Sequence, residues 1–493
     1  MSKDVRIKTA SSWQKDYVFS TITLLANTLI PLIIYPYLTR VLLVENLGKY
    51  NFAFSIASLF QLAAQLGLPY YGAREIAKVS HNPIELKKTA GELMGLSFVT
   101  GLVFMIIYVL AIVFVPQIHA EKTLFINIGL MVFLAPMVLN WLFQGLQEFK
   151  YIALRMVVFR TLGVVLMFVF VRDAGDYAIY GLIIAFVMAG HFPFNLAKTK
   201  KAIGSLPLSF KFKKHIAPAL LTLPVTVVNI VLIQVSSIML GFLSTDADVA
   251  FFSIPAQIIM VISSLLISLS YVMVPTLTKL LISQDKKEYL KTTKSVMNLS
   301  WFLVIPICAG LFMISKDVVV LFAGQQYAAA ALTMKIAAFR VIAIAISSFV
   351  GSQVLLCNGE EKKLCLSLVL GVLVMVALNL ILIPRYGHVG AMIGTVAAEY
   401  ALAAIQIMLA KKYLSIDMFL TKPLLRYVLI VLLFIPICWG IEVLDLSAAL
   451  TSVYAIGACA LVYFGALFAL KDKILLEVIN KIFKRPKQAE PLN

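Results

Sequence analysis

Fourteen long apolar stretches, separated by short polar loops, follow one another along the whole chain. Each is about 20 residues long, the length that an α-helix needs to cross a hydrocarbon core of roughly 30 Å. The apolar residues are continuous and do not alternate with polar ones, which predicts membrane-spanning helices and argues against a β-barrel. The predicted spans are 17–39, 50–71, 91–115, 123–145, 151–171, 177–196, 216–243, 249–273, 296–315, 330–356, 364–383, 388–410, 424–441 and 448–470.

Lysine and arginine are distributed unevenly between the loops. Most of the 42 lie in the N-terminal tail (Lys3, Arg6, Lys8, Lys15), in every second loop and in the C-terminal tail. Because basic loops stay on the cytoplasmic side of a membrane, this pattern predicts that both termini are cytoplasmic. It also explains the formal net charge of +18 without nucleic acid. The loops are too short for a nucleic-acid-binding module, so we expect no nucleic acid partner.

Composition supports the same fold class and narrows the chemistry. Hydrophobic residues make up 61% of the chain and charged residues 13%, whereas soluble domains are about 25% charged. The chain contains no P-loop, no HExxH motif and no nucleophile elbow, and its five cysteines form no CxxC pair. We therefore expect an all-α integral membrane protein with no cofactor, no metal site and no catalytic centre.

An internal repeat divides the predicted spans into two sets. The segment beginning Gly48-Lys-Tyr-Asn-Phe-Ala-Phe-Ser recurs loosely as Asp248-Val-Ala-Phe-Phe-Ser-Ile-Pro. Likewise, Gly145-Leu-Gln-Glu-Phe-Lys recurs as Cys357-Asn-Gly-Glu-Glu-Lys. Six spans separate the copies, and an even number places both copies in the same orientation, as in transporters that work by alternating access. The predicted parts are an N-terminal lobe (1–200, spans 1–6), a C-terminal lobe (201–412, spans 7–12) and a third part (413–493) with spans 13–14 and a basic cytoplasmic tail.

Few charged residues lie deep in the predicted spans, and such residues are functional candidates because burying a charge in lipid is costly. Arg160 lies roughly 13 Å into span 5, and Arg340 is similarly deep in span 10. Arg155 is nearer the inner edge, where its side chain could reach the interface. Each arginine either pairs with an acid or lines a wet cavity and binds an anion. Glu399, near the centre of span 12, either pairs with an arginine or couples transport to H⁺ or Na⁺.

Polar amides in the spans are candidates for contacts with a hydrated ligand. Gln61 and Gln65 are four residues apart and share one helix face, and Asn140 lies in span 4. Hydrogen bonding between helices would explain such residues equally well. A sugar-binding surface would need the same donors and acceptors.

One motif carries a family resemblance. The segment Leu66-Gly-Leu-Pro-Tyr-Tyr-Gly-Ala-Arg-Glu-Ile-Ala-Lys follows Tyr50-Asn-Phe-Ala-Phe-Ser and resembles proteins of the polysaccharide transporter family, O-antigen flippase type. That family belongs to the superfamily that also holds multidrug and toxin extruders and the lipid II flippase. The similarity extends over essentially the whole chain, and Arg74 matches the family motif. Arg74 could contact a lipid headgroup or anchor a loop.

The resemblance implies a function and its partners. A protein of this kind would move an undecaprenyl-diphosphate-linked oligosaccharide from the cytoplasmic to the outer leaflet of the bacterial plasma membrane, for O-antigen, capsule or exopolysaccharide synthesis. It would work beside polysaccharide polymerase or ligase machinery, among membrane lipids, with possible coupling to H⁺ or Na⁺. The cavity of such a protein would carry cationic residues.

Three rival functions make different demands on the sequence. A cation-coupled drug extruder of the same superfamily would need acidic groups in its cavity, whereas span 1 contains no Asp or Glu and deep arginines predominate. A membrane glycosyltransferase or polymerase would need a large loop with acidic residues, and the longest loops here are short and rich in lysine. A scaffold within a polysaccharide assembly complex is the third alternative.

Overall fold

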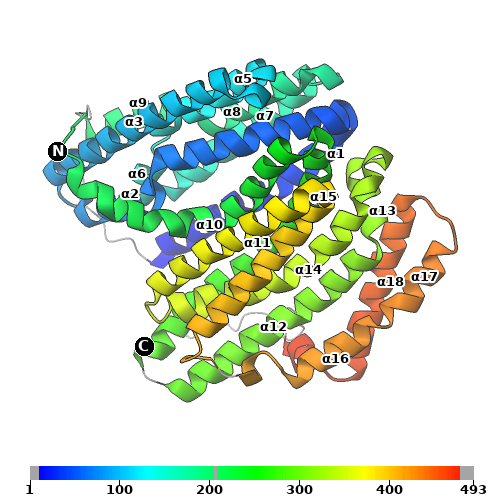
Figure 1. Cartoon of the computed structure of the whole chain (residues 1–493). Helices are drawn as coiled ribbons and strands as arrows, with labels where there is room; N and C mark the ends of the chain where they lie inside the picture. The colour runs from blue at the N-terminus through cyan, green and yellow to red at the C-terminus, as the bar shows by residue number, and fades with distance from the viewer. Residues whose placement is uncertain (1–9, 205–207, 284, 415, 478–493) are drawn as a thin grey trace. The chain divides into compact units, whose positions relative to one another are not determined.

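The computed structural model describes residues 10–204, 208–283, 285–414 and 416–477, and these ranges contain helices and no β-strand. Figure 1 labels most of the helices. The α-helices are α1 (Ala10–Gln65), α2 (Leu68–Val79), α3 (Pro83–Phe114), α4 (Pro116–Ala120), α5 (Lys122–Phe133), α6 (Asn140–Gly145), α7 (Phe149–Phe170), α8 (Tyr177–Ala189), α9 (Phe192–Ile203), α10 (Lys213–Leu243), α11 (Asp246–Ile282), α12 (Lys286–Met313), α13 (Ser315–Ala323), α14 (Ala331–Ser348), α15 (Glu361–Leu409), α16 (Lys422–Val431), α17 (Phe434–Glu442) and α18 (Ala448–Ala469). A π-helical segment, Phe349–Leu356, extends α14.

Each predicted span coincides with helical residues, and the all-helical fold class is confirmed. Ten helical stretches among the described residues are long and apolar enough to cross a membrane. Two of them, Ile33–Val79 and Glu361–Leu409, have 47 and 49 residues, more than twice the length that one crossing requires. Both contain a backbone break, at Leu43 (φ 62°) and Gly387 (φ 52°), within the loops expected between predicted spans. The count of fourteen crossings and the cytoplasmic location of the termini stay predictions.

Several predicted spans are interrupted, which corrects the expectation of continuous helices. Span 2 divides into α1 and α2, and span 13 divides into α16 and α17. Span 4 divides into α5 and α6, with a 3₁₀ turn at Ala135–Met137 between them. Span 6 divides into α8 and α9. Pro136 and Pro193 lie at the breaks in spans 4 and 6, and proline lacks the N–H that would continue the helical hydrogen bonds. The basic N-terminal residues before residue 10 and the tail after residue 477 lie outside the described residues.

The chain divides into two units, each of which packs mainly against itself. Unit 1 comprises Met1–Ser253 and Met375–Ala391, and unit 2 comprises Ile254–Val374 and Met392–Asn493. The predicted lobes 1–200 and 201–412 and the third part 413–493 stay predictions.

One core of unit 1 forms where α2 packs against α3, α6 and α10. Tyr71 and Ile76 of α2 are buried there together with Trp141 of α6. A Cβ atom on Gly72 would lie 3.2 Å from the Trp141 ring, and one on Gly145 would lie 2.6 Å from the Ile76 Cβ. Gly72 in the Gly-Ala-Arg-Glu-Ile-Ala motif and Gly145 on α6 therefore allow α2 and α6 to approach closely.

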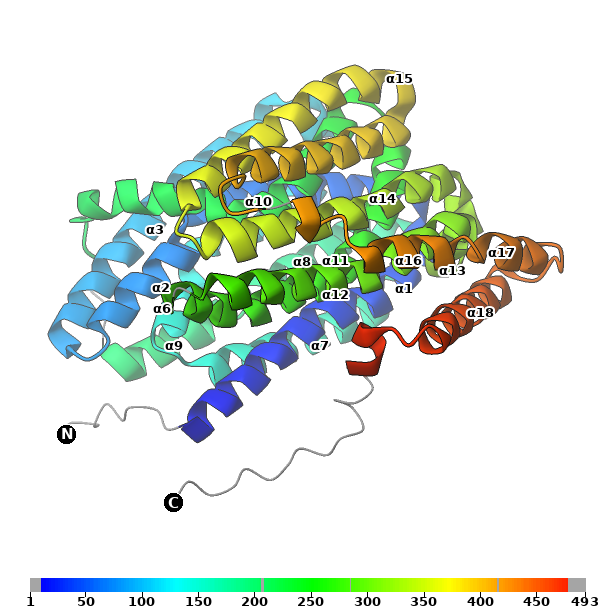
Figure 2. The same cartoon turned by 90° about the horizontal axis from the view of Figure 1, so that it is seen from below.

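A core of unit 2 joins α12 to α16 and α18. Predicted spans 13 and 14 lie on α16, α17 and α18, which Figure 2 shows in orange and red. The Trp301 indole N–H donates to the Phe419 carbonyl at 3.1 Å, and the Tyr463 hydroxyl donates to the Phe302 carbonyl at 2.8 Å. Tyr427 and Tyr463 are fully or almost fully buried against α12. Spans 13 and 14 are therefore part of the packed core of unit 2.

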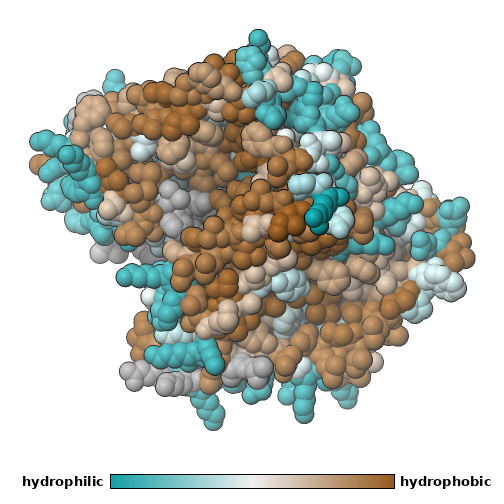
Figure 3. Space-filling model, in the orientation of Figure 1, coloured by the Kyte–Doolittle hydropathy of each residue, from teal (hydrophilic) through white to brown (hydrophobic). Residues whose placement is uncertain are grey.

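Large apolar side chains are exposed along the flanks of helices in both units. Leu461 is 78% exposed and Phe114 is 74% exposed. Figure 3 shows brown hydrophobic residues covering much of the visible helix surface, with teal hydrophilic residues gathered mostly near helix ends. Such extended apolar surface suits contact with acyl chains rather than water.

Candidate functional site

Arg155 lies at the centre of a buried polar cluster in unit 1. Its side chain is on α7 and 7% exposed. Its two terminal nitrogens donate hydrogen bonds to amide oxygens, Nη1 to Asn195 on α9 and Nη2 to Asn140 on α6. The Tyr151 hydroxyl also donates to the Asn195 oxygen, at 2.9 Å. Three helices therefore hold one guanidinium in place.

The Arg155 cluster keeps a net positive charge. Among the described residues, no carboxylate lies within ion-pair distance of this guanidinium, and its Nε has no hydrogen-bond partner. Glu148 instead pairs with Lys198 at 3.0 Å. The Lys198 ammonium lies 4.0 Å and the Arg155 Cζ lies 5.4 Å from the centre of the Tyr151 ring. A buried charge held only by neutral amides is costly, and an anion would relieve that cost.

His191 is a second buried group near this cluster. It is 7% exposed, its Nε2 has no hydrogen-bond partner in the part of the chain that the structure describes, and its ring lies 5.5 Å from that of Phe159. Burial of this kind is expected of a packing residue, and the unsatisfied nitrogen leaves room for one more partner.

Arg160 follows Arg155 on α7 and is half-buried. Five residues along an α-helix correspond to a rotation of about 500°, which places the two side chains about 140° apart. They therefore do not share one helix face. That Arg160 lines an anion-binding cavity stays a prediction.

Arg340 and Glu399 form a buried ion pair in unit 2. The Arg340 Nη2 lies 2.8 Å from Glu399 Oε1, and Nε donates to the same oxygen at 3.2 Å. Both residues are 4% exposed. Of the two alternatives stated for Arg340, the structure shows pairing with an acid.

Arg74 and the two glutamines occupy less buried positions. Arg74 lies on α2 with its side chain 52% exposed, and its Cζ is 5.7 Å from the Tyr71 ring centre. Gln61 on α1 donates to the Met131 carbonyl at 3.4 Å, while Gln65 is the last residue of α1. The structure does not bring these residues to the Arg155 cluster through any hydrogen bond among the described residues. Of the predicted candidates, only Asn140 joins Arg155.

A buried hydrogen-bonded chain was missed by the sequence analysis. Tyr71 on α2 bonds His215 Nδ1 on α10 at 2.7 Å, and His215 Nε2 lies 3.1 Å from Glu92 Oε2 on α3. Lys214 also pairs with Glu92, at 2.8 Å. All but Lys214 are at most 4% exposed. The available signal was an acid at the start of span 3 and a histidine just before span 7. These two polar side chains are far apart in the sequence and meet in the structure.

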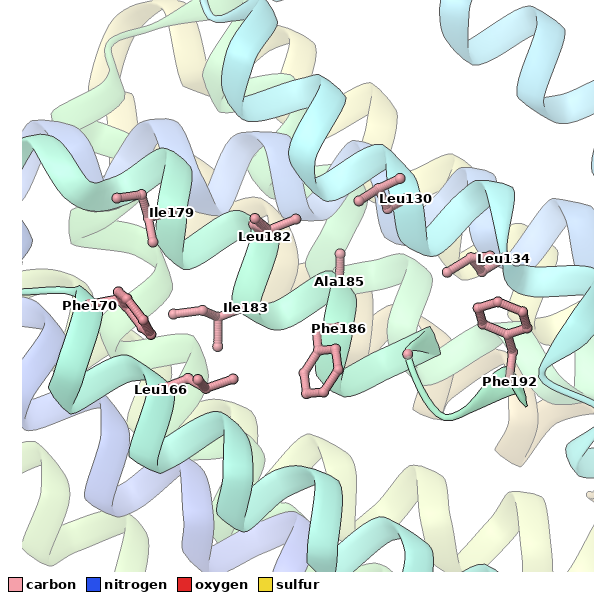
Figure 4. Close-up of a pocket in the computed structure, with 11 residues that line it drawn as sticks. Leu130, Leu134, Leu166, Phe170, Ile179, Leu182, Ile183, Ala185, Phe186 and Phe192 are labelled. Carbon is pink, nitrogen blue, oxygen red and sulfur yellow. The ribbon is translucent and has the colours of Figure 1, made fainter. Parts of the chain in front are cut away.

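An apolar pocket of about 570 Å³ lies between α5, α7 and α8 (Figure 4). Its lining includes Leu134, Phe170, Leu182, Phe186 and Phe192. No charged side chain lines this pocket, so it suits a hydrocarbon chain and not a hydrated headgroup.

The sequence matches the model of a known protein family over more than half of its length. The model of the family described as "Polysaccharide biosynthesis protein" matches residues 13–281, which is more than half of the 493 residues. The chain belongs to the polysaccharide biosynthesis protein family. The resemblance carried by the Gly72–Ala77 motif is thereby confirmed.

Curated relatives of this polysaccharide biosynthesis protein carry a transporter name. A "Putative O-antigen transporter" of Shigella dysenteriae is 24% identical over 382 residues, which cover 76% of this chain and 94% of the relative. A protein of Escherichia coli (strain K12) with the same name is 22% identical over 420 residues, covering 81% and 97%. Together with the ten apolar helices, these relatives show a multi-pass membrane protein.

Solved structures show which fold this family member shares. The lipid II flippase MurJ in an inward closed conformation has a TM-score of 0.72 and 15% identity, covering 95% of this chain and 100% of MurJ. A multidrug resistance MATE family transporter of the MOP superfamily, in an inward-facing conformation, has a TM-score of 0.59 and 14% identity, covering 80% and 97%. At these identities the likeness establishes the fold and does not identify a ligand.

Proposed function

We propose that this polysaccharide biosynthesis protein is a flippase for an undecaprenyl-diphosphate-linked oligosaccharide. It moves the repeat unit from the cytoplasmic to the outer leaflet of the bacterial plasma membrane by alternating access, with both termini in the cytoplasm. The product supplies O-antigen, capsule or exopolysaccharide synthesis, beside polymerase or ligase machinery. Family membership and the O-antigen transporter relatives support this substrate class.

The Arg155 cluster is the observation that carries the proposal. A diphosphate carries about two negative charges, and guanidinium is the side chain best suited to bind phosphate oxygens through paired N–H groups. Asn140 and Asn195 orient Arg155 without neutralising it. The group can therefore bind an anion strongly once substrate replaces an amide partner or reaches the unpaired Nε.

The other candidates have secondary roles in this proposal. Arg160, Arg74, Gln61 and Gln65 offer cationic or amide groups to the hydrated sugars as the head moves. The ion pair between Arg340 and Glu399 must be strained or opened if Glu399 binds the H⁺ or Na⁺ that drives the cycle. Its burial keeps either group from acting alone, because removing one partner leaves an unpaired charge.

A reconstituted flipping assay tests the proposal. Proteoliposomes containing a fluorescent undecaprenyl-diphosphate-linked oligosaccharide would compare the wild type with Arg155→Gln, Arg160→Ala and Arg340→Ala. Arg172→Gln is the matched control, because Arg172 is exposed and outside the cluster. We expect at least a tenfold loss of flipping for Arg155→Gln, partial rescue by Arg155→Lys, and no change in the control.

Two results would contradict the proposal. If Arg155→Gln flipped the substrate at the wild-type rate, Arg155 would not contact the diphosphate. If the wild type failed to flip the lipid but exported a cationic dye, the drug-extruder function would be favoured instead.

A further inference from the structure

A second pocket in unit 1 combines lysines with exposed apolar side chains. It has a volume of about 850 Å³ and lies between the first turns of α3 and the segment that leads into α10. Lys87 and Lys88 of α3 and Lys211 of the leading segment line it. Ile84, Leu208 and Phe210 form part of its apolar wall. This composition differs from the wholly apolar pocket between α5, α7 and α8.

The lysines of this pocket are not neutralised by neighbouring acids. Among the described residues, no carboxylate lies within ion-pair distance of Lys87, Lys88 or Lys211. Lys214, a few residues further along, differs because Glu92 pairs with it at 2.8 Å. Glu85, the acid in the first turn of α3, does not line the pocket. Three positive charges are therefore available to one anion.

The apolar side chains that form the wall of this pocket are unusually exposed. Ile84 is 81% exposed, Phe210 is 65% exposed and Leu208 is 48% exposed. Ile84 lies in the first turn of the candidate membrane helix α3, and Leu208 and Phe210 lie in the segment before α10. All three are beside lysines, which is the arrangement expected at the boundary between headgroups and acyl chains. An amphiphilic ligand would cover both the charged and the apolar parts.

The segment before α10 lies directly against the backbone of α3 in the wall of this pocket. The Ser209 N–H donates to the Gly91 carbonyl at 3.2 Å. A Cβ atom on Gly95 would lie 2.1 Å from the Ser209 carbonyl oxygen, so only glycine allows this packing. The Asn82 side chain already accepts from the N–H groups of Ile84 and Glu85, which leaves the lysines as the groups that hold an anion.

We propose that this pocket binds the phosphate headgroup of an anionic membrane lipid. Lys87, Lys88 and Lys211 surround the phosphate, and Ile84 and Phe210 contact the first part of the acyl chains. The bound lipid holds the segment before α10 against α3. This inference goes beyond the proposed function, because the lipid is not transported and Arg155 takes no part in binding it.

Photo-crosslinking in nanodiscs tests this lipid site. The full chain would be placed in phosphatidylcholine nanodiscs containing a photoactivatable phosphatidylglycerol, and crosslinked peptides would be located by mass spectrometry. We expect crosslinks in peptides containing residues 83–88 and 208–211. Combining Lys87→Gln, Lys88→Gln and Lys211→Gln should weaken binding about 100-fold, because all three ammonium groups that contact the one phosphate are lost.

A matched control variant distinguishes lipid binding at this pocket from general attraction of lipid to surface lysines. Lys279→Gln, Lys287→Gln and Lys362→Gln remove the same total charge from exposed positions outside the pocket. We expect this control to weaken binding less than tenfold. Ile84→Ser combined with Phe210→Ser, which leaves every lysine in place, should also reduce crosslinking.

Three outcomes would overturn the inference. Equal losses in the two lysine variants would show diffuse attraction to a basic surface. Full competition by inorganic phosphate would identify a site for a soluble anion, not for a lipid. Crosslinking that is unaffected in a folded pocket variant, as judged by size-exclusion chromatography and circular dichroism, would place the lipid elsewhere. Since binding is measured without transport, failure here is distinguishable from failure of the flippase proposal.

Discussion

Asn51 donates a hydrogen bond of 2.7 Å to the hydroxyl of Ser253, a residue 202 positions later in the chain. The two residues lie in the two segments of the sequence repeat. Nearby, Ser55 donates to Gln234 at 2.8 Å, and a Cβ atom on Gly48 would lie only 1.8 Å from the Asp246 carbonyl oxygen. The starts of predicted spans 2 and 8 are therefore joined by direct polar and backbone contacts within unit 1.

A double-mutant cycle measures the strength of this contact. We expect Asn51→Ala and Ser253→Ala each to destabilise the protein, and the coupling energy between them to be about 0.6 kcal/mol, as for hydrogen bonds between membrane helices. The measurement is unfolding in mixed micelles with increasing denaturing detergent. Strictly additive effects would show that the bond contributes nothing to stability.

A second stability prediction concerns the buried ion pair between Arg340 and Glu399. Glu399→Leu alone should destabilise the protein by about 3–5 kcal/mol, because it leaves a buried guanidinium without its partner. Combining it with Arg340→Met should restore most of that stability, since neither charge then remains. Unfolding in mixed micelles gives both values. A double variant no more stable than Glu399→Leu would show that packing, and not the unpaired charge, causes the loss.

The same double variant tests whether the Arg340–Glu399 pair only stabilises the fold or also couples transport to H⁺ or Na⁺. We expect the restored protein to flip the lipid-linked oligosaccharide at less than a tenth of the wild-type rate, because no carboxylate remains to bind H⁺ or Na⁺. The proteoliposome assay, run with and without a proton or sodium gradient, provides the measurement. Wild-type flipping by the stable double variant would assign the pair a structural role only.

The positions of the helices were predictable because lipid offers no hydrogen bonds to the backbone, so each apolar stretch must form a helix. The breaks near Pro136 and Pro193 were not predictable from proline alone. A proline within a span either kinks the helix or ends it, and neighbouring helices decide which by satisfying the freed carbonyls. The division of spans 4 and 6 therefore became visible only with the packing.

The charged candidates could be found from the sequence, but their pairings could not, and Asn195, which accepts a hydrogen bond from Arg155, was not among the candidates. Arg155, Arg340 and Glu399 stood out because charges are rare in apolar spans. Which arginine would meet Glu399 depends on how α14 packs against α15, and sequence position does not encode that. Glu92 was missed because a charge at the end of a span costs little, so it gave no signal until His215 was found beside it.

Glycine packing between α2 and α6 gives a stability prediction with an internal control. Gly145→Ala should destabilise the protein by about 1–3 kcal/mol, because the new methyl group would lie 2.6 Å from the Ile76 Cβ and 2.7 Å from the Ala73 carbonyl oxygen. Gly457→Ala on α18 meets nothing within 4 Å and should be neutral or slightly stabilising. Thermal unfolding in detergent compares the two. Equal effects would show that helix propensity, and not the close contact, determines the cost.

We expect the outer face of the helices of predicted spans 13 and 14 to hold the lipid tail of the substrate. Their inner faces are committed to the core of unit 2 through Tyr427 and Tyr463, so deleting them would expose that core and unfold the unit. The outer face is different: Leu461 is 78% exposed and Leu425 is 63% exposed.

If this face holds the isoprenoid chain, a photoreactive amino acid at Leu461 should crosslink to undecaprenyl-diphosphate-linked oligosaccharide in preference to bulk phospholipid. The matched probe replaces Phe114 on α3, which is 74% exposed and belongs to unit 1. We expect several-fold more substrate crosslinking at Leu461 than at Phe114 when both lipids are present at equal concentration. Equal labelling at the two positions would mean that spans 13 and 14 contact the bilayer as any other helix does, and that the tail travels along another surface.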